Sequence, residues 1–514
     1  MAYDYAPFPY VAPPGLIAPE PRAPVAIVGA GPIGLAMAID LAQRGIACVV
    51  LDDNNVVSVG SRAICWAKRT LEIMDRLGVG ERMLEKGVTW KVGRLFHGAD
   101  EVYSFDLLPE AGHKYPAFIN LQQYYVEQFL VERAQELSAF IDLRFLNRLT
   151  SHRDQGDHVV LEIETPDGPY TLEADYLIAA DGAGSPTRKR MGLPFEGQTF
   201  DEHFLIIDVE LPESPFATDD PERWFWFAPP FHNGQSALLH KQPDNIYRID
   251  LQLGPETDPK LEATETKVIP RIKAIIGDMP FRLDWMSVYK FRCAKLDRFV
   301  HGRVIFVGDS AHVVSPFGAR GGNGGIQDVD NLGWKLAEVL RGGALTLLDS
   351  YDEERHHGAL ENIANSARAT NFITPKSEID TLFRNETLRL AHKQPFARKL
   401  INSGRLSAPC SLADMALQSG DHPLVGRSLI DLPMGDGWLV EQAQGGFCLL
   451  TADEQAWQVP DAVTRIPLPD TELRHARYGD TGAFLVRPDG HICARLAGPS
   501  GLVAALARAK GGAS

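Results

Sequence analysis

Short, unbroken runs of apolar residues recur along the chain. Val25–Val28 and Ile46–Leu51 are runs of the kind found in strands that are buried on both faces of a sheet. Residues 35–43 between them have the spacing of a helix. Tyr176–Ala180 and Val304–Val307 repeat the strand pattern much later in the chain. We therefore expect one buried sheet whose strands come from distant segments.

The pattern changes in the middle of the chain and again near its end. Residues 204–253 combine alternating apolar and polar positions with many aromatic residues, which predicts an antiparallel sheet inserted into the first domain. Helical spacing is found at residues 122–140, 325–340 and 348–368. After about residue 407, strand-like runs and a last helix predict a small α/β domain, at residues 447–450, 483–486, 492–495 and 502–508.

Three glycines follow the first strand at the spacing of a dinucleotide-binding turn. Gly29 permits a tight turn, Gly31 lets the backbone approach a pyrophosphate, and Gly34 lets the next helix lie close to the sheet. Pro32 lies within the same turn, beside a helix N-terminus that attracts phosphate. Asp52 stands 23 residues after Gly29, where an acid can accept hydrogen bonds from an adenosine ribose. The alternative is a glycine-rich turn in an ordinary α/β unit.

Two more glycine-bearing segments follow buried strands. They are Asp181-Gly182-Ala183-Gly184 and Gly308-Asp309-Ser310-Ala311-His312. An Asp-Gly pair after a strand is most often an ordinary turn, so neither segment is specific by itself. Their order after the first segment, and the strands that precede them, point to one ligand, a flavin adenine dinucleotide (FAD).

With the stretch from Arg303 to Asn323 included, the chain resembles the single-component flavoprotein aromatic hydroxylases, which act on p-hydroxybenzoate, phenol and 3-(3-hydroxyphenyl)propionate. The likeness covers about residues 25–368. It implies an α/β (α+β) fold with a Rossmann-type FAD domain, an inserted antiparallel sheet that roofs the flavin, and a thioredoxin-like C-terminal domain. That last domain has no C-x-x-C pair here, so we expect a structural role or dimer contacts from it rather than redox chemistry.

The expected division of the chain follows from this likeness. It comprises an N-terminal arm (1–24), the first part of the FAD domain (25–190), the substrate-binding sheet (191–295), the second part of the FAD domain with its helices (296–405), and the C-terminal domain (406–514).

The resemblance also implies cofactor contacts beyond the first turn, at Arg62, Gln123, Asp181, Gly308, Asp309, Gly321, Gly322 and Asn323. Arg62 resembles the pyrophosphate-binding arginine of the family, and Gln123 a glutamine that reaches the FAD from the first long helix. Asp181 belongs to a motif used for both FAD and the reduced nicotinamide. The N–H groups of residues 321–323 are expected at the pyrimidine end of the flavin, which is anionic when reduced. The alternative for Arg62 and Gln123 is a solvated surface side chain.

One departure from the family lies in the flavin loop, which reads Arg320-Gly321-Gly322-Asn323 here. Arg320 keeps a cation at a position where relatives often have lysine or glutamine, and we connect it with flavin movement or nicotinamide approach. Gly322 replaces a larger side chain, so we expect that edge of the pocket to be loosened.

Candidate substrate contacts lie on the inserted sheet, at Trp226, Phe227, Leu238, Gln242, Arg248 and Asp250. Leu238, His240 and Gln242 share one face of their strand because side chains alternate. In an ungapped comparison, Gln242 stands where the p-hydroxybenzoate enzyme has its carboxylate-binding arginine, so p-hydroxybenzoate is not the expected substrate. Arg248 is the residue we expect to meet the carboxylate of a longer substituent.

The expected reaction is hydroxylation of a phenolic aromatic by dioxygen, with NADH or NADPH as electron donor and a flavin C4a-hydroperoxide as oxidant. His240 and Tyr289 are alternative groups for removing the phenol proton, and Pro316 is expected to line the pocket. Three alternative functions remain open. Trp224–Pro229 is similar to the tryptophan motif of flavin-dependent halogenases, although no partnering lysine is identified. The others are an FAD oxidase or reductase and a non-catalytic flavin-binding protein.

Composition narrows the partners to small molecules. The 514 residues include 51 basic and 67 acidic side chains, a net charge of −16, with no basic block that would bind nucleic acid. No 18-residue apolar run predicts a membrane span, and residues 1–24 do not resemble a signal peptide. Six scattered cysteines predict reduced thiols in the cytoplasm rather than a zinc site or disulfides. We expect a phenolic substrate and dioxygen as partners and leave a homodimer open.

Overall fold

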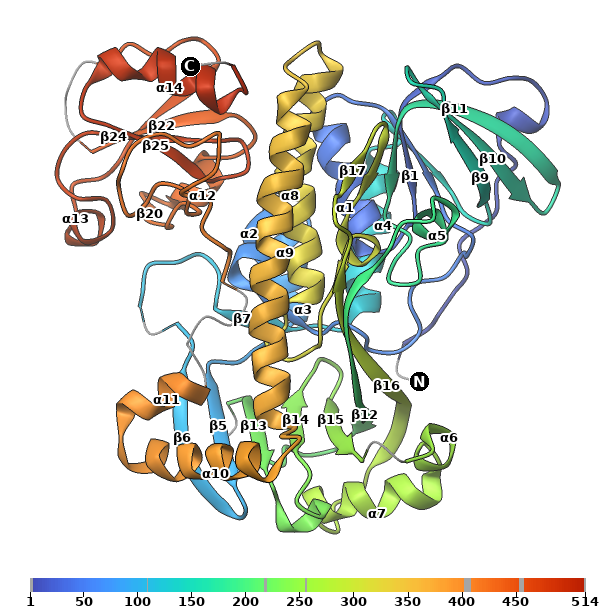
Figure 1. Cartoon of the computed structure of the whole chain (residues 1–514), viewed down its shortest axis with the longest axis vertical. Helices are drawn as coiled ribbons and strands as arrows, with labels where there is room; N and C mark the ends of the chain where they lie inside the picture. Colours follow the sequence, from blue (N-terminus) through green and yellow to red (C-terminus); the bar gives the residue numbers. More distant parts are fainter. Residues whose placement is uncertain are drawn as a thin grey trace.

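Five parallel strands form the centre of the first sheet, in the order β18-β11-β1-β2-β8 (Figure 1). The computed structural model describes residues 3–108, 110–216, 220–254, 257–401, 408–452 and 457–512. The strands are β1 (Ala23–Val28), β2 (Cys48–Leu51), β8 (Ile141–Arg144), β11 (Gly168–Ala179) and β18 (Val304–Phe306), with β17 (Val300–His301) antiparallel at the edge. A hairpin arm of β9 (Arg148–Asp154) and β10 (Val159–Thr165) extends from β11. The sheet predicted from distant apolar runs is therefore present.

The second sheet lies below the first in Figure 1 and has eight strands, in the order β19-β16-β12-β15-β14-β13-β5-β6. They are β5 (Val92–His97), β6 (Asp100–Asp106), β12 (Glu196–Glu210), β13 (Glu222–Phe227), β14 (Ala237–Lys241), β15 (Ile246–Leu253), β16 (Arg282–Lys295) and β19 (His312–Val313). It is larger than the predicted segment 191–295, because β5 and β6 come from the segment assigned to the FAD domain. β5 pairs with β13 in parallel, whereas the other neighbours are antiparallel.

Helices pack around both sheets. They are α1 (Pro32–Gln43), α2 (Lys68–Arg76), α3 (Gly80–Lys86), α4 (Gln123–Glu136), α5 (Pro186–Arg190), α6 (Pro259–Glu262), α7 (Glu265–Ile276), α8 (Gly321–Leu340), α9 (Thr346–Ile373), α10 (Glu378–Lys393) and α11 (Pro395–Ile401). A small sheet of β3 (Cys65–Ala67), β7 (Phe118–Asn120) and β4 (Val88–Thr89) lies between the two large ones. Among the described helices, none combines the length and apolarity needed to cross a membrane.

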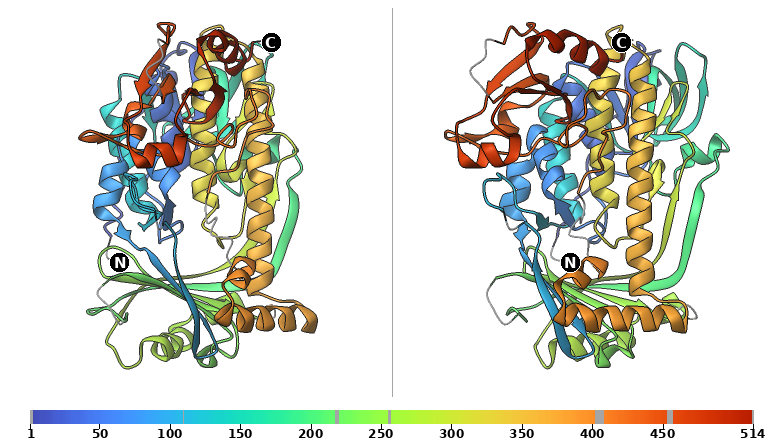
Figure 2. Two further views of the ribbon diagram at one scale, coloured as in Figure 1. Left: turned by 90° about the vertical axis from the view of Figure 1, so that its left-hand side faces the viewer. Right: turned by 60° about the vertical axis from the view of Figure 1, so that its left-hand side comes forward.

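Helix α9 connects the regions of the molecule. Its 28 residues span about 42 Å at the usual helical rise. Figures 1 and 2 show it running from the C-terminal domain to the second sheet. Near its middle, Arg355 Nε donates to Asp328 Oδ1 of α8 at 2.7 Å, and near its end the hydroxyls of Thr370 and Ser315 lie 2.7 Å apart. The helix thus fixes the segment that follows β18.

The C-terminal domain has the strand order β23-β22-β24-β25. β22 (Phe447–Thr451) and β23 (Val463–Pro467) are parallel, while β24 (Ala483–Val486) and β25 (Ile492–Leu496) are antiparallel to their neighbours. This is the order of a thioredoxin-like sheet, completed by α13 (Glu472–Tyr478) and α14 (Leu502–Ala509), with the short elements β20 (Pro433–Met434), β21 (Gly437–Trp438) and α12 (Leu439–Gln442) beside it. The predicted boundary at residues 405–406 lies outside the described residues.

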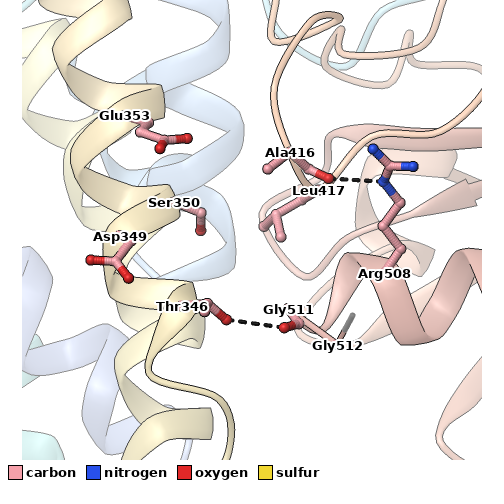
Figure 3. A pocket seen from close by; sticks show the side chains of 9 residues that line it. All are labelled: Thr346, Asp349, Ser350, Glu353, Ala416, Leu417, Arg508, Gly511 and Gly512. Carbon is pink, nitrogen blue, oxygen red and sulfur yellow. Dashed lines mark hydrogen bonds between the residues drawn. The ribbon is translucent and has the colours of Figure 1, made fainter. Parts of the chain in front are cut away.

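A buried ionic cluster joins this domain to α8 and α9. Arg487 donates to both carboxylate oxygens of Glu354, at 2.6 and 2.9 Å, and to Asp489. Lys335 Nζ donates to Glu354 Oε2 at 2.8 Å, and all four side chains are 1% exposed or less. A pocket of about 400 Å³ lies where α9 begins, between Thr346 and the last helix of the chain (Figure 3).

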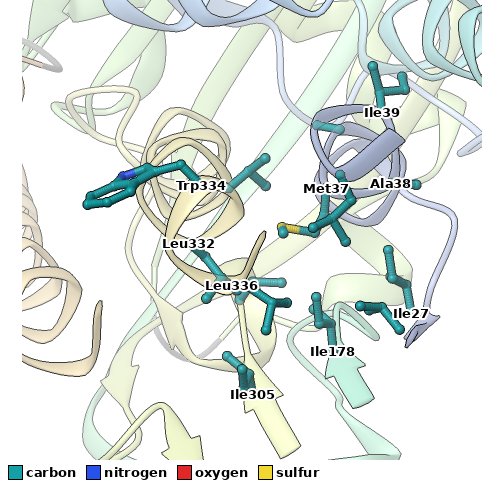
Figure 4. Packing of buried hydrophobic residues seen from close by; sticks show 14 of the residues in the cluster. Ile27, Met37, Ala38, Ile39, Ile178, Ile305, Leu332, Trp334 and Leu336 are labelled. Atoms are coloured by element: carbon teal, nitrogen blue, oxygen red, sulfur yellow. The ribbon is translucent and has the colours of Figure 1, made fainter. Parts of the chain in front are cut away.

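The core of the first domain lies between its sheet and two helices. Ile27, Ile178 and Ile305 stand side by side on β1, β11 and β18 and are fully buried. Figure 4 shows their side chains facing those of Met37 on α1 and Leu336 on α8. This packing fixes the carboxyl ends of the three strands, and each strand is followed there by one of the glycine-bearing segments.

The described part of the N-terminal arm packs on the surface of the first domain. Phe8 stacks on Phe145 with ring centroids 4.7 Å apart. The hydroxyl of Tyr5 accepts a hydrogen bond from the Gly60 N–H at 3.0 Å. The arm therefore reaches the loop that carries Arg62.

Candidate active site

The three glycine-bearing segments converge at the carboxyl ends of β1, β11 and β18. Gly29 has a φ of +104°, and a Cβ there would lie 2.4 Å from the carbonyl oxygen of Ala180, directly before Asp181. Arg188 of the second segment donates to the Ser310 carbonyl of the third at 2.7 Å. Ligands of α/β sheets bind at this edge of the strands.

The two remaining glycines of the first turn differ in what surrounds them. A Cβ at Gly34 would lie 1.8 Å from the Gly29 carbonyl oxygen, so only glycine lets α1 start this close to the strand. A Cβ at Gly31 would have no described atom within 4 Å beyond its own chain neighbours. Gly31 is also the N-cap of α1, whose first N–H groups have no intrahelical acceptor. This open, positively polarised turn fits the pyrophosphate of FAD.

Two carboxylates flank the same region. Asp52 accepts hydrogen bonds from the backbone N–H of Ala30 at 2.5 Å and of Asn54 at 2.8 Å, so it braces the glycine turn. Burial raises the pKa of Asp52. Asp309 follows Gly308 with an exposed side chain, yet the surrounding protein also raises the pKa of its carboxyl by desolvation. An exposed carboxylate at this position suits contact with a polyhydroxylated chain such as ribityl.

Asn323 holds the start of α8 in place. Its Oδ1 accepts from Ala67 N at 2.9 Å and Thr70 Oγ1 at 2.6 Å, and its Nδ2 donates to Cys65 O at 2.9 Å and Ala319 O at 2.6 Å. The side-chain amide is therefore fully used by the protein. What remains for a ligand is the first turn of α8, where the N–H groups of residues 321–323 lack intrahelical acceptors.

Gly322 does not loosen the site as expected. A Cβ at this position would lie 3.3 Å from the ring of Trp66, which is 1% exposed. The indole takes the space that a side chain at 322 would fill. Arg320 is buried and donates to Asn362 Oδ1 of α9 at 2.9 Å, so it is held against that helix.

The side chains of the other predicted cofactor residues differ in whether they are free to contact a ligand. Gln123 accepts from Ala63 N at 3.1 Å and donates to Ser58 and Glu127, so its amide supports the loop before Arg62. Asp181 accepts from Ser185 Oγ at 2.5 Å and Thr187 N at 2.9 Å, at the start of α5. Arg62 itself has an exposed side chain. Of the three side chains, only that of Arg62 is exposed, and their contacts with the cofactor stay predictions.

A row of polar residues crosses the second sheet on the face that meets the first domain. Pairing across β13, β14, β15, β12 and β16 aligns Arg223, His240, Arg248, Asp208 and Trp285. The next row contains Leu238, Asp250 and Ile206. His240 and Leu238 of β14 therefore lie beside Arg248 and Asp250 of β15 on one face of the sheet. Alternation along each strand had predicted only that each pair shares a face of its own strand.

Trp226 is the exception among the predicted substrate residues. It pairs with Ala237, which faces away from His240, and it packs against Phe96 and Phe231 on the far side of the sheet. Trp226 thus cannot contact a ligand that lies between the sheet and the flavin loop. Phe227 has the opposite parity and packs against Phe372 near the end of α9.

Arg248 is committed to protein partners. Its Nε donates to Asp250 Oδ1 at 2.8 Å, and its Nη1 donates to the carbonyls of Ser61 at 2.5 Å and Arg62 at 3.0 Å. The guanidinium joins the second sheet to the loop of the FAD domain. These bonds use Nε and Nη1, so Arg248 could meet a substrate carboxylate only through the two N–H groups of Nη2, and that role stays a prediction.

His240 and Gln242 have buried polar atoms without partners. Neither ring nitrogen of His240 has a hydrogen-bond partner among the described residues, and Asp250 Oδ2 is 3.8 Å from its Nε2. Burial lowers the pKa of His240 to about 4, which keeps the ring neutral. Gln242 Nε2 donates to Asp208 Oδ1 at 3.0 Å, but its Oε1 has no described partner.

Tyr289 and Pro316 stand apart from this pair. Tyr289 is paired with Phe204, so three strand spacings, about 14 Å, separate its strand from that of His240. The two residues cannot serve the same phenol hydroxyl. Pro316 is exposed on the segment between β19 and α8.

Asp208 is a site residue that the sequence pattern did not reveal. It is 2% exposed and accepts hydrogen bonds from Ser61 Oγ and Gln242 Nε2. Burial raises the pKa of this carboxyl to about 7, although the nearby Arg248 opposes the shift. A single aspartate in an apolar strand belongs to no sequence motif. Only the pairing of Asp208 with Arg248 across the sheet shows that it lies in the candidate site.

This pKa predicts a pH dependence of stability. An acid whose folded-state pKa is raised favours folding at low pH, and this contribution is lost as the pH rises through the folded pKa. We expect the apoprotein to lose about 1.4 kcal/mol of unfolding free energy between pH 6 and pH 8 through Asp208. Urea unfolding of Asp208→Asn should lack this decrease, and an equal decrease in the variant would contradict the assignment.

Comparison with known proteins was made against this geometry. A family model described as "FAD binding domain" matches residues 22–366. The chain is 31% identical over 517 residues to the 12-dehydrotetracycline 5-monooxygenase/anhydrotetracycline 6-monooxygenase of Streptomyces rimosus subsp. rimosus, covering 94% of this chain and 98% of that protein. It is 29% identical over 490 residues to the 3-(3-hydroxy-phenyl)propionate/3-hydroxycinnamic acid hydroxylase of Escherichia coli O139:H28, covering 90% and 86%.

The fold is also found among solved structures. The crystal structure of the flavin-dependent monooxygenase PieE in complex with FAD and substrate superposes with a TM-score of 0.80 at 23% identity, covering 96% of this chain and 100% of that one. The resemblance expected from the glycine-bearing segments is confirmed by these similarities.

Proposed function

Since the chain belongs to the FAD binding domain family, we propose that it hydroxylates a phenolic aromatic substrate with dioxygen and with NADH or NADPH as electron donor. Relatives that match it along nearly its whole length are named as a monooxygenase and a hydroxylase. The name of the Escherichia coli relative gives a hydroxyphenyl substrate, and that of the Streptomyces relative gives tetracycline derivatives. When bound, FAD supplies electron transfer from the nicotinamide and activation of oxygen. The protein must supply the binding, the orientation and the proton transfers.

The observation that carries the proposal is the buried imidazole of His240. Its ring nitrogens have no described partner, and it lies on the sheet face that Arg248 joins to the Ser61-Arg62 loop. Asp250 favours the proton on Nε2, which leaves Nδ1 as an acceptor for the proton of a phenol. A hydrogen bond from the phenol hydroxyl to this atom raises the electron density of the phenol ring. We therefore propose His240, in place of Tyr289, as the group that polarises the phenol, acting as a neutral acceptor because burial lowers its pKa.

The remaining residues position the reaction. The N–H groups at the start of α8 favour negative charge at the pyrimidine end of a flavin. Arg248 keeps the second sheet against the loop before Arg62, so that the substrate face and the flavin region are held together. That Pro316 lines the pocket stays a prediction. The cytoplasmic location and the homodimer stay predictions.

No second function is proposed. The halogenase-like segment places Trp224 and Trp226 on the far face of the sheet, where they pack with Phe96. That packing accounts for both tryptophans without a halogenation site.

We expect nicotinamide oxidation by the holoenzyme to be slow until an aromatic substrate binds. In this type of enzyme the flavin has two positions, and the nicotinamide reaches only one of them. The substrate can shift the flavin to that position only if it binds that state of the protein more tightly than the other. A tenfold stimulation corresponds to about 1.4 kcal/mol of such preference. The measurement is NADH and NADPH consumption against a panel of phenols, with the product identified by mass after reaction under ¹⁸O₂. Equal rates with and without every phenol, or products lacking ¹⁸O, would contradict the proposal.

A further inference from the structure

Exposed apolar side chains gather on two neighbouring helices, α10 and α11. Among the residues that the structure describes, 14 large apolar side chains are exposed, and six of them belong to these two helices. They are Ile379, Leu382, Phe383 and Leu390 on α10, which are 79%, 62%, 60% and 41% exposed, and Phe396 and Leu400 on α11, which are 65% and 43% exposed. The two helices pack on each other at the end of the molecule opposite the C-terminal domain (Figures 1 and 2).

On α10 the four exposed apolar side chains form one stripe. They lie within about 100° of each other around a helix of 3.6 residues per turn. The buried face of α10 is centred about 130° away and consists of Arg384, Thr387, Leu388 and Ala391. Its apolar members belong to the cluster that also contains Phe227 and Leu238 of the second sheet. The helix is therefore apolar on two faces, and the described chain covers only one of them.

Charged side chains on one flank of the stripe change sign along α10. Glu378 lies in the first turn, and Arg389 and Lys393 lie near the end, all exposed and within about 60° of each other around the helix. Arg389 binds Glu386 of its own helix at 2.6 Å, which leaves Lys393 as the cation at the end of the flank. Lys376, before the helix, lies over the ring of Phe200 at 5.8 Å. The flank is thus negative where α10 begins and positive where it ends.

A second copy of the same helix complements this pattern. When two copies of α10 pack antiparallel about a twofold axis, the same flank of each copy meets, with the start of one helix beside the end of the other. Glu378 then faces Lys393 of the second copy at both ends, and the apolar stripes meet between them. A parallel arrangement would set like charges against each other, which is unfavourable.

The apolar area of this surface suits an interface of ordinary size. At about 150 Å² for a large apolar side chain, the exposed portions of the six amount to about 500 Å² per copy. A standard interface buries about 800 Å² per partner, of which roughly 450 Å² is apolar. The stripe and the neighbouring side chains of α11 therefore supply the apolar centre of such an interface, with the charged flanks as its rim.

We propose that two copies of this chain form a dimer through α10, packed antiparallel about a twofold axis, with the apolar stripes in contact and Glu378 of each copy facing Lys393 of the other. This inference goes beyond the proposed function and does not depend on it. It places the dimer contact away from the C-terminal domain, where Val503 is the one exposed large apolar side chain among the described residues.

The first test is the mass of the holoenzyme in solution. Sedimentation equilibrium at about 0.1–100 µM should give the mass of two chains at the upper concentrations. Phe383→Glu buries two carboxylates in the centre of the dimer, so its dissociation constant should rise about a hundredfold or more. Because Phe383 is exposed in the single chain, the variant should keep its circular dichroism and its flavin content. Val503→Glu is the matched control, since it changes an exposed apolar side chain of α14 and should leave the dissociation constant unchanged.

Charge reversals test the antiparallel arrangement. Glu378→Lys and Lys393→Glu each place like charges at both ends of the dimer, so each should raise the dissociation constant about tenfold. The two reversals combined restore opposite charges across the interface, and the dissociation constant should return to within about threefold of the wild-type value. An effect on α10 alone would instead accumulate in the combined variant, because both substitutions oppose the helix dipole.

The outcomes decide between the possible occupants of the stripe. A monomer at every concentration overturns the proposal, and so does a dimer that Phe383→Glu leaves intact. Dissociation by Val503→Glu but not by Phe383→Glu would place the contact in the C-terminal domain. A monomer that sediments with phosphatidylglycerol vesicles, and loses this binding in Phe383→Glu, would assign the stripe to a lipid surface. A combined reversal weaker than either single one would contradict the antiparallel pairing.

Discussion

Gly31→Val should yield a folded protein that no longer retains FAD. Position 31 has ordinary extended backbone angles, φ −75° and ψ −177°, and a Cβ there meets no described atom within 4 Å. The added side chain therefore enters the space of the pyrophosphate and not the protein core. Loss of two hydrogen bonds to a charged phosphate weakens FAD binding by about a hundredfold or more. The measurement is released flavin per protein together with the circular dichroism of the purified variant.

Gly34→Val provides the contrast on the same turn. Its Cβ would lie 1.8 Å from the Gly29 carbonyl oxygen. Because that oxygen belongs to the backbone, the clash can be relieved only if the backbone moves. We expect this variant to be insoluble or unfolded, with or without added FAD. A Gly31 variant with wild-type FAD content, or a Gly34 variant with normal folding, would show that the turn does not hold the cofactor as described.

Arg487→Met should destabilise the protein by about 3–5 kcal/mol, the usual cost of removing one partner from a buried ion pair. Arg487 is fully buried and holds Glu354 and Asp489 together, so its loss leaves two carboxylates with Lys335 as the nearby cation. Urea unfolding can be followed by tryptophan fluorescence, because the Trp334 ring lies 5.6 Å below the guanidinium.

An exposed ion pair serves as the control for this substitution. Arg282 binds Glu210 at the edge of the second sheet, with side chains 53% and 39% exposed. Arg282→Met should cost less than about 1 kcal/mol, since solvent screens such pairs. A similar effect of the two substitutions would mean that the cluster around Glu354 contributes no more than a surface contact.

The parts of the fold that the sequence predicts are those set by neighbouring residues. The turn at Gly29, the helix after it and the strand before Asp52 depend on local spacing, and all were found where expected. The face assignments of Leu238 and His240 were also correct, because alternation within one strand is local. For Trp226 no local signal says which parity faces the flavin, since both faces of β13 carry large aromatic rings.

What the sequence does not reveal depends on pairings between distant segments. β5 joins the second sheet through a parallel pairing with β13, and such a contact leaves no spacing pattern. The filling of the space beside Gly322 by Trp66 is likewise a contact across the fold. Arg248 illustrates the same limit for the site, because its ordinary strand position gave no sign that the Ser61 and Arg62 carbonyls occupy its guanidinium.

The strand order of the first sheet bears on how the protein is made. β11 ends at residue 179, but its neighbour β18 begins at residue 304, so one edge of β11 lacks its partner while the intervening chain is synthesised. At typical translation rates this lasts about 10 seconds. An unpaired strand edge invites pairing with other chains during that interval. The third glycine-bearing segment follows β18 directly, so FAD can bind only after this gap is closed. Protection of the nascent chain by chaperones, rather than the stability of the finished enzyme, should therefore limit its yield in cells.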